Sequence, residues 1–177
     1  MANDRKVLED ELLKIRKADI HDLNFLFSLE NNSSLWYVSD TYSPFSKLDI
    51  RQHLESSVYD IYTTKQLRLI IENKAINDYC GIVDLFEFSP LHLRAGIGIV
   101  ICEKYRDMKI ATNALQCVID YCVNVLMLKQ LWCYIDENNI NSIKLFKKLN
   151  FEQSGFLKAW KKTPNGFMNV YVYQLIF

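Results

Sequence analysis

Apolar residues recur along this chain with two periods, and the change from one period to the other marks a series of short elements. Alternating or continuous apolar runs predict strands; they cover residues 12–17, 67–72, 80–86, 95–101, 130–136, 151–160 and 168–177. Apolar residues three or four apart predict helices; these cover residues 19–30, 49–58, 111–126 and 139–149. The resulting order, β-α-α-β-β-β-α-β-α-β-β, indicates an α+β fold around one mostly antiparallel sheet.

One stretch, Arg94 to Leu126, joins a strand, a basic turn and a long helix in immediate succession. Its strand is the apolar run Ile97–Ile101, and Arg106 and Lys109 lie in the turn before the helix. The first amides of a helix have no partner within it and the helix dipole is positive there, so this unit suits a phosphate group. An ordinary β-α connection with a solvated basic tip fits the same residues.

The chain of 177 residues is most simply one domain, residues 1–177, in which residues 1–11 form a polar N-terminal extension. Lys+Arg and Asp+Glu balance at 21 each, which argues against a binding surface for nucleic acid or for an anionic membrane. The N-terminus lacks the apolar segment of a signal peptide, and no apolar run approaches the roughly 20 residues of a membrane span. These features predict a cytoplasmic protein.

The five cysteines, at positions 80, 102, 117, 122 and 133, form no CxxC pair, and their number is odd. Four of them lie in apolar strand-like or helix-like runs, so we expect reduced core residues. The three histidines, at positions 21, 53 and 92, have no ligand spacing. The sequence therefore predicts no metal site.

Two motifs on these elements resemble those of the GNAT N-acetyltransferases, nearest the branch that contains ribosomal-protein N-terminal and spermidine acetyltransferases. The first, from Arg106 through Lys109 to Ala111, is similar to the acetyl-CoA motif (Q/R)-x-x-G-x-(G/A). The second, from Asn139 to Phe151, is similar to N-x-x-(S/A)-x-x-x-(Y/F)-x-K-x-G-F. Both occur in the family's order and spacing, and the likeness covers about residues 12–177.

The resemblance implies a GNAT acyl-CoA N-acyltransferase fold, a mixed, mostly antiparallel, seven-stranded sheet flanked by about four helices. In this fold the central strand and the strand at 130–136 splay apart, and acetyl-CoA lies between them as a co-substrate. Its pantetheine arm would pair with the central strand, where Gly98 would form a bulge, and its diphosphate would lie on the first amides of the long helix. The implied coenzyme-binding residues are Ile99, Val100, Ile101, Arg106, Asp107, Met108, Lys109, Ile110, Ala111, Thr112, Asn139, Ser142, Phe146 and Lys148.

Three positions depart from the family's pattern. Lys109 replaces the motif glycine, and its β-carbon costs on the order of 1 kcal/mol if φ is positive. Either this cost lowers the affinity for the coenzyme, or the lysine ammonium offsets it by binding phosphate. Phe146 replaces the tyrosine that often protonates the leaving thiolate, and Gly96 replaces an acidic residue that often serves as the base.

Other residues then become candidates for the catalytic roles. Tyr134, on the strand beside the gap, is a candidate acid, and water or the incoming ammonium is the alternative. Asp84 and Glu87 precede the central strand, and since they are three apart in a strand at most one faces the gap; we favour Glu87. Asn139 is expected to bind near the pantetheine, or only to cap its helix.

The acceptor site is expected next to the loop between the first two helices. Trp36, Tyr37 and Tyr42 offer an apolar or cation–π wall there, or they simply pin the loop to the core. Glu30 and Asp84 are further substrate-binding candidates. Carboxylates are few in this region, which disfavours a highly cationic polyamine.

The sequence thus predicts an acetyl-CoA-dependent N-acetyltransferase that moves the acetyl group to a primary amine by direct attack in a ternary complex. The acceptor is a small-molecule amine or a peptide N-terminus, and the last strand or the helices offer a surface for a homodimer. The alternative is a catalytically weak or inactive module of the same fold that binds CoA or a protein partner. Lys109, Phe146 and Gly96 favour that alternative.

Overall fold

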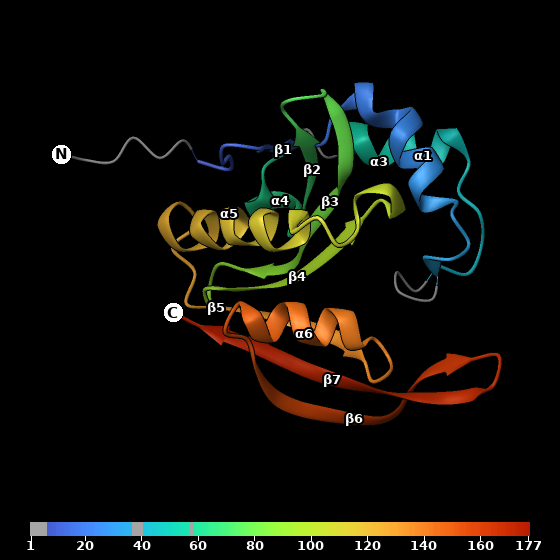
Figure 1. Ribbon diagram of the computed structural model, residues 1–177, viewed down its shortest axis with the longest axis vertical. Helices are drawn as coiled ribbons and strands as arrows, with labels where there is room; N and C mark the ends of the chain where they lie inside the picture. The colour runs from blue at the N-terminus through green and yellow to red at the C-terminus, as the bar shows by residue number, and fades with distance from the viewer. Residues whose placement is uncertain (1–6, 37–40, 57–58) are drawn as a thin grey trace.

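A computed structural model describes residues 7–36, 41–56 and 59–177 of the chain (Figure 1). The strands are β1 (Leu13–Lys17), β2 (Leu67–Asn73), β3 (Asp78–Ser89), β4 (Arg94–Ile101), β5 (Gln130–Asp136), β6 (Glu152–Thr163) and β7 (Gly166–Ile176). The α-helices are α1 (Leu23–Glu30), α3 (Lys47–Ser56), α4 (Ile61–Thr64), α5 (Ile110–Asn124) and α6 (Ile140–Lys148). The 3-10 helices are η1 (Ile20–Asp22) and η2 (Glu103–Tyr105). This order agrees with the predicted one, apart from the short helices α4 and η2, which the apolar pattern does not indicate.

The described strands form one seven-stranded sheet in the order β1-β2-β3-β4-β5-β7-β6. Every neighbouring pair is antiparallel except β4 and β5, which run parallel. The predicted fold class, a mixed and mostly antiparallel sheet flanked by helices, is therefore confirmed.

Helices cover both faces of the sheet. On one face, apolar residues pack beneath α5 and α6, with Leu115 and Phe146 among the buried helix residues. On the other face, Leu26 of α1 and Leu54 of α3 pack onto the sheet around Ile82. Figure 1 shows α5 and α6 lying along the strands, and α1 and α3 side by side at the upper right of the view. Burial of apolar surface on both sides stabilises the sheet between the two helical layers.

The two central strands, β4 and β5, pair only at one end. The three pairs are Arg94↔Gln130, Ala95↔Leu131 and Gly96↔Trp132. Beyond them β4 continues to pair with β3 as far as Ile101, and β5 pairs with β7 over Gln130–Asp136. Because each strand follows its other neighbour, a wedge-shaped gap opens between them from Ile97 onward.

The bulge predicted at Gly98 is absent. The ladder between β3 and β4 is unbroken from Gly81↔Ile101 to Phe86↔Gly96. The register shifts instead between Phe86 and Ser89 of β3, where Glu87 has a positive φ of 47°. The irregularity therefore lies at the end of β3 and not at the gap.

An aromatic ring explains the glycine at position 96. A β-carbon on Gly96 would lie 2.3 Å from the ring of Phe86, well inside van der Waals contact. That ring packs edge-on against Trp132, with centroids 5.1 Å apart and an interplanar angle of 85°. An acidic side chain at position 96 would need the space that Phe86 occupies, so its absence is a consequence of packing.

We expect Gly96→Ala to lower the free energy of unfolding by about 1–3 kcal/mol, because the methyl group must push Phe86 off Trp132. Gly98→Ala is the matched control, since its β-carbon would meet Phe86 at 3.8 Å, an ordinary contact. Urea unfolding of both variants measures the difference. Equal stability of the two variants would contradict this packing.

Candidate active site between strands β4 and β5

The free edge of β4 forms the floor of the gap. The backbone N–H of Cys102 donates to the carbonyl of Cys80 on β3 at 2.8 Å. Backbone groups alternate along an antiparallel ladder, so those of Val100 also point to β3. Those of Ile99 and Ile101 point the other way, into the gap. An extended ligand can therefore pair with Ile99 and Ile101, but not with Val100.

The turn before α5 lies beyond the open end of β4. Arg106 is exposed at the end of η2, and Lys109 is the N-cap of α5 with a positive φ of 60°. No side chain caps this helix. The amides of Ile110, Ala111 and Thr112 are therefore available to an anion, with two basic side chains next to them. Lys109 has the left-handed backbone that glycine usually provides.

A buried tyrosine fixes this turn to the sheet. Tyr105 is 7% exposed and donates its hydroxyl to Asp78 at 2.7 Å, and Lys104 forms an ion pair with the same carboxylate. Hydrogen bonds from Lys104 and then Tyr105 lower the pKa of Asp78. Asp107, with φ of 62°, and Met108 stay exposed at the tip of the turn. The start of β3 therefore sets the position of the α5 N-terminus.

The residues of the second motif lie on α6. Asn139 is the N-cap of this helix, and its side-chain oxygen accepts the N–H of Ser142 at 3.1 Å. Its amide nitrogen donates no hydrogen bond within the described part of the chain. Phe146 is 4% exposed and packs edge-on against Phe151, while Lys148 is exposed in the last turn. Asn139 thus retains a free donor, whereas the ring of Phe146 belongs to the core.

A cavity of about 600 Å³ opens on the opposite face of the sheet, beside α1 and α3. Its described lining residues are Glu30, Thr41, Phe45, Asp49, Ile50, His53, Arg68, Asp84, Phe86, Gly98, Ile99 and Val100. Gly98 and Ile99 belong to the part of β4 that borders the gap. The cavity and the gap therefore meet at β4, and ligands in the two places could touch.

A half-buried arginine joins two of the candidate carboxylates in this cavity. Arg68 donates from Nε and Nη2 to the two oxygens of Asp84, both at 2.8 Å, and from Nη1 to Glu30. Burial lowers the pKa of Arg68, but the charges of Asp84 and Glu30 outweigh burial, so its pKa is raised. Arg68 and Asp84 face each other across β2 and β3. Only the strand register identifies this pair, so the sequence alone does not single out Arg68.

Three aromatic side chains form a row from β3 to β5. Trp132 packs against Phe86 on one side and against Tyr134 on the other, with centroids 5.1 and 4.9 Å apart. Tyr134 lies beyond the last pair between β4 and β5 and is 50% exposed. Its phenol is therefore accessible beside the gap.

The other predicted residues do not gather at the gap. Glu87 is exposed on the irregular end of β3 and is not among the described residues that line this cavity. Trp36 donates its indole N–H to the Glu30 carbonyl at 2.8 Å, which pins the loop to α1. Tyr42 is 86% exposed, and Tyr37 lies outside the described residues. Among the described residues, the aromatic side chains beside the gap come from strands, and neither Trp36 nor Tyr42 lines this cavity.

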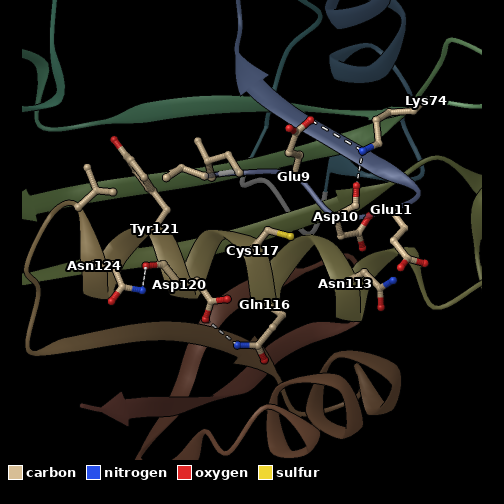
Figure 2. Close-up of a pocket in the computed structure, with 13 residues that line it drawn as sticks. Glu9, Asp10, Glu11, Lys74, Asn113, Gln116, Cys117, Asp120, Tyr121 and Asn124 are labelled. Carbon is tan, nitrogen blue, oxygen red and sulfur yellow. Dashed lines mark hydrogen bonds and ion pairs between the residues drawn. The ribbon is translucent and has the colours of Figure 1, made fainter. Parts of the chain in front are cut away.

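A larger cavity, of about 930 Å³, lies away from the gap. It is lined by the N-terminal segment Val7–Glu11 and by the side of α5 that carries Asn113 and Gln116 (Figure 2). Lys74 spans its rim and forms an ion pair with Glu9 at 3.8 Å. None of its described lining residues belongs to β4, β5 or the turn before α5. This cavity is therefore separate from the candidate active site.

None of the five cysteines, all of which the structure describes, forms a disulfide; Cys80, Cys122 and Cys133 are core residues as predicted, whereas Cys102 and Cys117 are half-buried. Burial raises the pKa of Cys122 to about 12, so this thiol stays protonated at neutral pH. No group of three His, Cys, Asp or Glu residues that could hold a metal ion occurs among the described residues. No helix of the described ranges is long and apolar enough to cross a membrane.

Comparison with known proteins gives consistent matches. A family model described as "Acetyltransferase (GNAT) domain" matches residues 12–152. Spermidine N(1)-acetyltransferase of Escherichia coli (strain K12) is 30% identical over 149 residues, which cover 82% of this chain and 75% of that protein. Spermidine N-acetyltransferase from Vibrio cholerae, crystallised with CoA and spermine, has a TM-score of 0.85 at 19% identity, covering 94% of this chain and 96% of that one. A dodecameric structure of spermidine N-acetyltransferase from Vibrio cholerae gives a TM-score of 0.81 at 20% identity, covering 94% of this chain and 95% of that one.

Lys109→Gly is expected to raise the dissociation constant of CoA about 3–10-fold, because it removes an ammonium beside the diphosphate position. Its stability should stay equal or rise by up to about 1 kcal/mol, since glycine relieves the left-handed strain at φ of 60°. Calorimetric titration with CoA and thermal unfolding measure the two effects. Lys129→Ala, beyond the far end of α5, controls for net charge. Tighter binding by Lys109→Gly would show that the lysine obstructs the coenzyme.

Asn139→Asp and Asn139→Ala separate capping from ligand binding. Aspartate keeps the oxygen that caps α6, so its stability should match the wild type, whereas alanine should cost about 1 kcal/mol. Both variants lose the amide donor, so we expect turnover to fall about tenfold in each. Steady-state kinetics and thermal unfolding supply the measurements. Wild-type turnover in Asn139→Asp would reduce Asn139 to a helix cap.

Proposed function

The chain belongs to the GNAT acetyltransferase family, and on that basis we propose that it transfers the acetyl group of acetyl-CoA to a small-molecule primary amine. The parting of β4 and β5, next to an uncapped helix N-terminus, is the observation that carries the proposal. The pantetheine arm would pair with the free backbone of Ile99 and Ile101. The diphosphate would bind the first amides of α5 and the side chains of Arg106 and Lys109.

The reaction proposed is direct attack in a ternary complex. The amine nitrogen attacks the thioester carbonyl carbon, the C–S bond breaks, and the CoA thiolate leaves. The meeting of gap and cavity near Gly98 would hold the two reactants together, which supplies the proximity that such a reaction needs. Tyr134 is the proposed proton donor to the thiolate, and the free amide of Asn139 would bind the pantetheine. Glu87 has no part in this scheme, because it is exposed outside the cavity.

The charge of the cavity supports an acceptor with a second cationic group. Its described lining includes three carboxylates, of Glu30, Asp49 and Asp84, and one guanidinium, of Arg68. Together they give the cavity a net charge of minus two. Hydrogen bonds from the turn before α3 lower the pKa of Asp49, which keeps it ionised at the exposed side of the cavity. The names of the relatives point to amines of the same kind. The positive charges of a diamine or of spermidine would match this small negative charge better than those of a longer polyamine.

We further propose a single catalytic domain over residues 1–177, with residues 1–11 as an extension, in the cytoplasm. The free thiols support a reducing compartment. The exposed aromatic residues Phe156, Trp160 and Phe167 on the β6–β7 hairpin support self-association, of which a homodimer is the simplest form.

An amine panel tests the proposal. Thiol release from acetyl-CoA would be followed with butylamine, butane-1,4-diamine, spermidine, spermine and a short peptide with a free α-amine. We expect kcat/KM for butane-1,4-diamine and spermidine to exceed that for butylamine about tenfold, from attraction of the second ammonium. Asp49→Asn should narrow this difference, whereas Glu55→Gln, on the same helix but not among the lining residues, should leave it unchanged.

The rival function, a module that binds CoA without turnover, gives a different result in the same panel. CoA would then shift the unfolding temperature, but no amine would release thiol. Failure of CoA to bind at millimolar concentration would reject both the enzyme and the CoA-binding module.

A further inference from the structure

A histidine lies where the acceptor cavity adjoins a smaller one. His53, on α3, lines both the cavity of about 600 Å³ and the adjoining cavity of about 150 Å³. Its imidazole forms no hydrogen bond within the described residues. The other titratable side chains that line the cavity of about 600 Å³ already form hydrogen bonds. Arg68, Asp84 and Glu30 form one ion-paired group, and Asp49 accepts the N–H of Ser46. Among the described titratable residues that line this cavity, His53 is therefore the one whose side chain forms no hydrogen bond.

The surroundings keep this imidazole neutral. The charged groups that face it come from each element packed there: Lys17 on β1, Glu30 on α1, Asp49 on α3, Arg68 on β2 and Asp84 on β3. Burial lowers the pKa of His53 and the charge of Arg68 lowers it further, against a smaller opposing effect of Asp84 and Glu30. The pKa therefore lies below its ordinary value of about 6.5. At neutral pH a nitrogen lone pair is free to accept a proton.

An amine acceptor needs such a group. A primary amine is an ammonium ion at neutral pH and has no lone pair with which to attack a thioester. The carboxylates of Asp84 and Glu30 both accept hydrogen bonds from Arg68, which occupies them. The Asp49 carboxylate lies on the exposed side of the cavity and caps the turn before α3. His53 and Gly98 line the same cavity, and Gly98 borders the gap proposed for the thioester, so an amine in this cavity can approach both.

We propose that His53 is the base that removes a proton from the acceptor ammonium, an inference that rests on the proposed amine acetylation. One imidazole nitrogen takes the proton and becomes imidazolium. The free amine then attacks the carbonyl carbon, the C–N bond forms and the C–S bond breaks. The new amide nitrogen loses its second proton and the thiolate gains one, which gives the N-acetyl amine and CoA. The imidazolium returns its proton to water.

The pH profile of His53→Gln tests this role, with spermidine and butane-1,4-diamine as probes at saturating acetyl-CoA. In the wild type, kcat/KM should reach a plateau above the pKa of His53 and fall as pH drops through it, because the imidazole becomes protonated. The profile of His53→Gln should have no such plateau, and its kcat/KM at pH 7 should be about 100-fold lower than that of the wild type. The deficit should shrink as pH rises toward the pKa of the amine itself, where free amine no longer needs a base.

The exposed loop residue His92 supplies the matched control, since His92→Gln should keep the wild-type profile. CoA affinity and unfolding temperature should be unchanged in His53→Gln, which shows that the fold and the coenzyme site are intact. An unchanged profile, or an equal loss at every pH, would overturn the role of His53 while leaving the acetyltransferase function in place. A wild-type protein that acetylates neither probe would overturn both.

Discussion

The loss of pairing between β4 and β5 is the constraint on which the rest of the site depends. β4 pairs along its length with β3, and β5 pairs along its length with β7. β4 and β5 therefore share only three residue pairs before they diverge (Figure 1). Backbone groups that are half-buried and unpaired carry a free-energy cost unless water or a ligand satisfies them. The edge formed by Ile99 and Ile101 therefore suits an extended ligand that supplies the missing hydrogen bonds.

The features around the gap fit two ligands that approach β4 from different sides. The turn that ends at Lys109 is held by Tyr105 on Asp78, so the positive end of α5 has a fixed position beyond the strand edge. The cavity beside α1 and α3 lies on the opposite face, where Arg68 links α1, β2 and β3 through Glu30 and Asp84. Fixed elements on both sides of β4 suit a reaction in which the correct orientation of two reactants provides much of the rate enhancement. Burial raises the pKa of the Cys80 and Cys122 thiols, so neither is a ready nucleophile at neutral pH.

Much of the fold follows from local sequence pattern, but much of the acceptor site does not. The strand at 130–136 and the helix cap at Asn139 are local features, and the structure contains both as expected. The ion-paired group around Arg68 depends on the register of β2 against β3, which no single stretch encodes. The space over Gly96 depends on Phe86, a residue ten positions earlier on another strand. Trp36 shows the reverse case, because a conspicuous loop aromatic serves to hold the loop on α1.

Residue-resolved amide hydrogen exchange with and without CoA tests the central claim most directly. The amides of Ile99 and Ile101 point into the gap, whereas that of Val100 already bonds to β3. If the gap holds the coenzyme, CoA should slow exchange at Ile99, Ile101 and the first amides of α5, and should change Val100 much less. Binding of CoA that leaves Ile99 and Ile101 unprotected would contradict this account of the site.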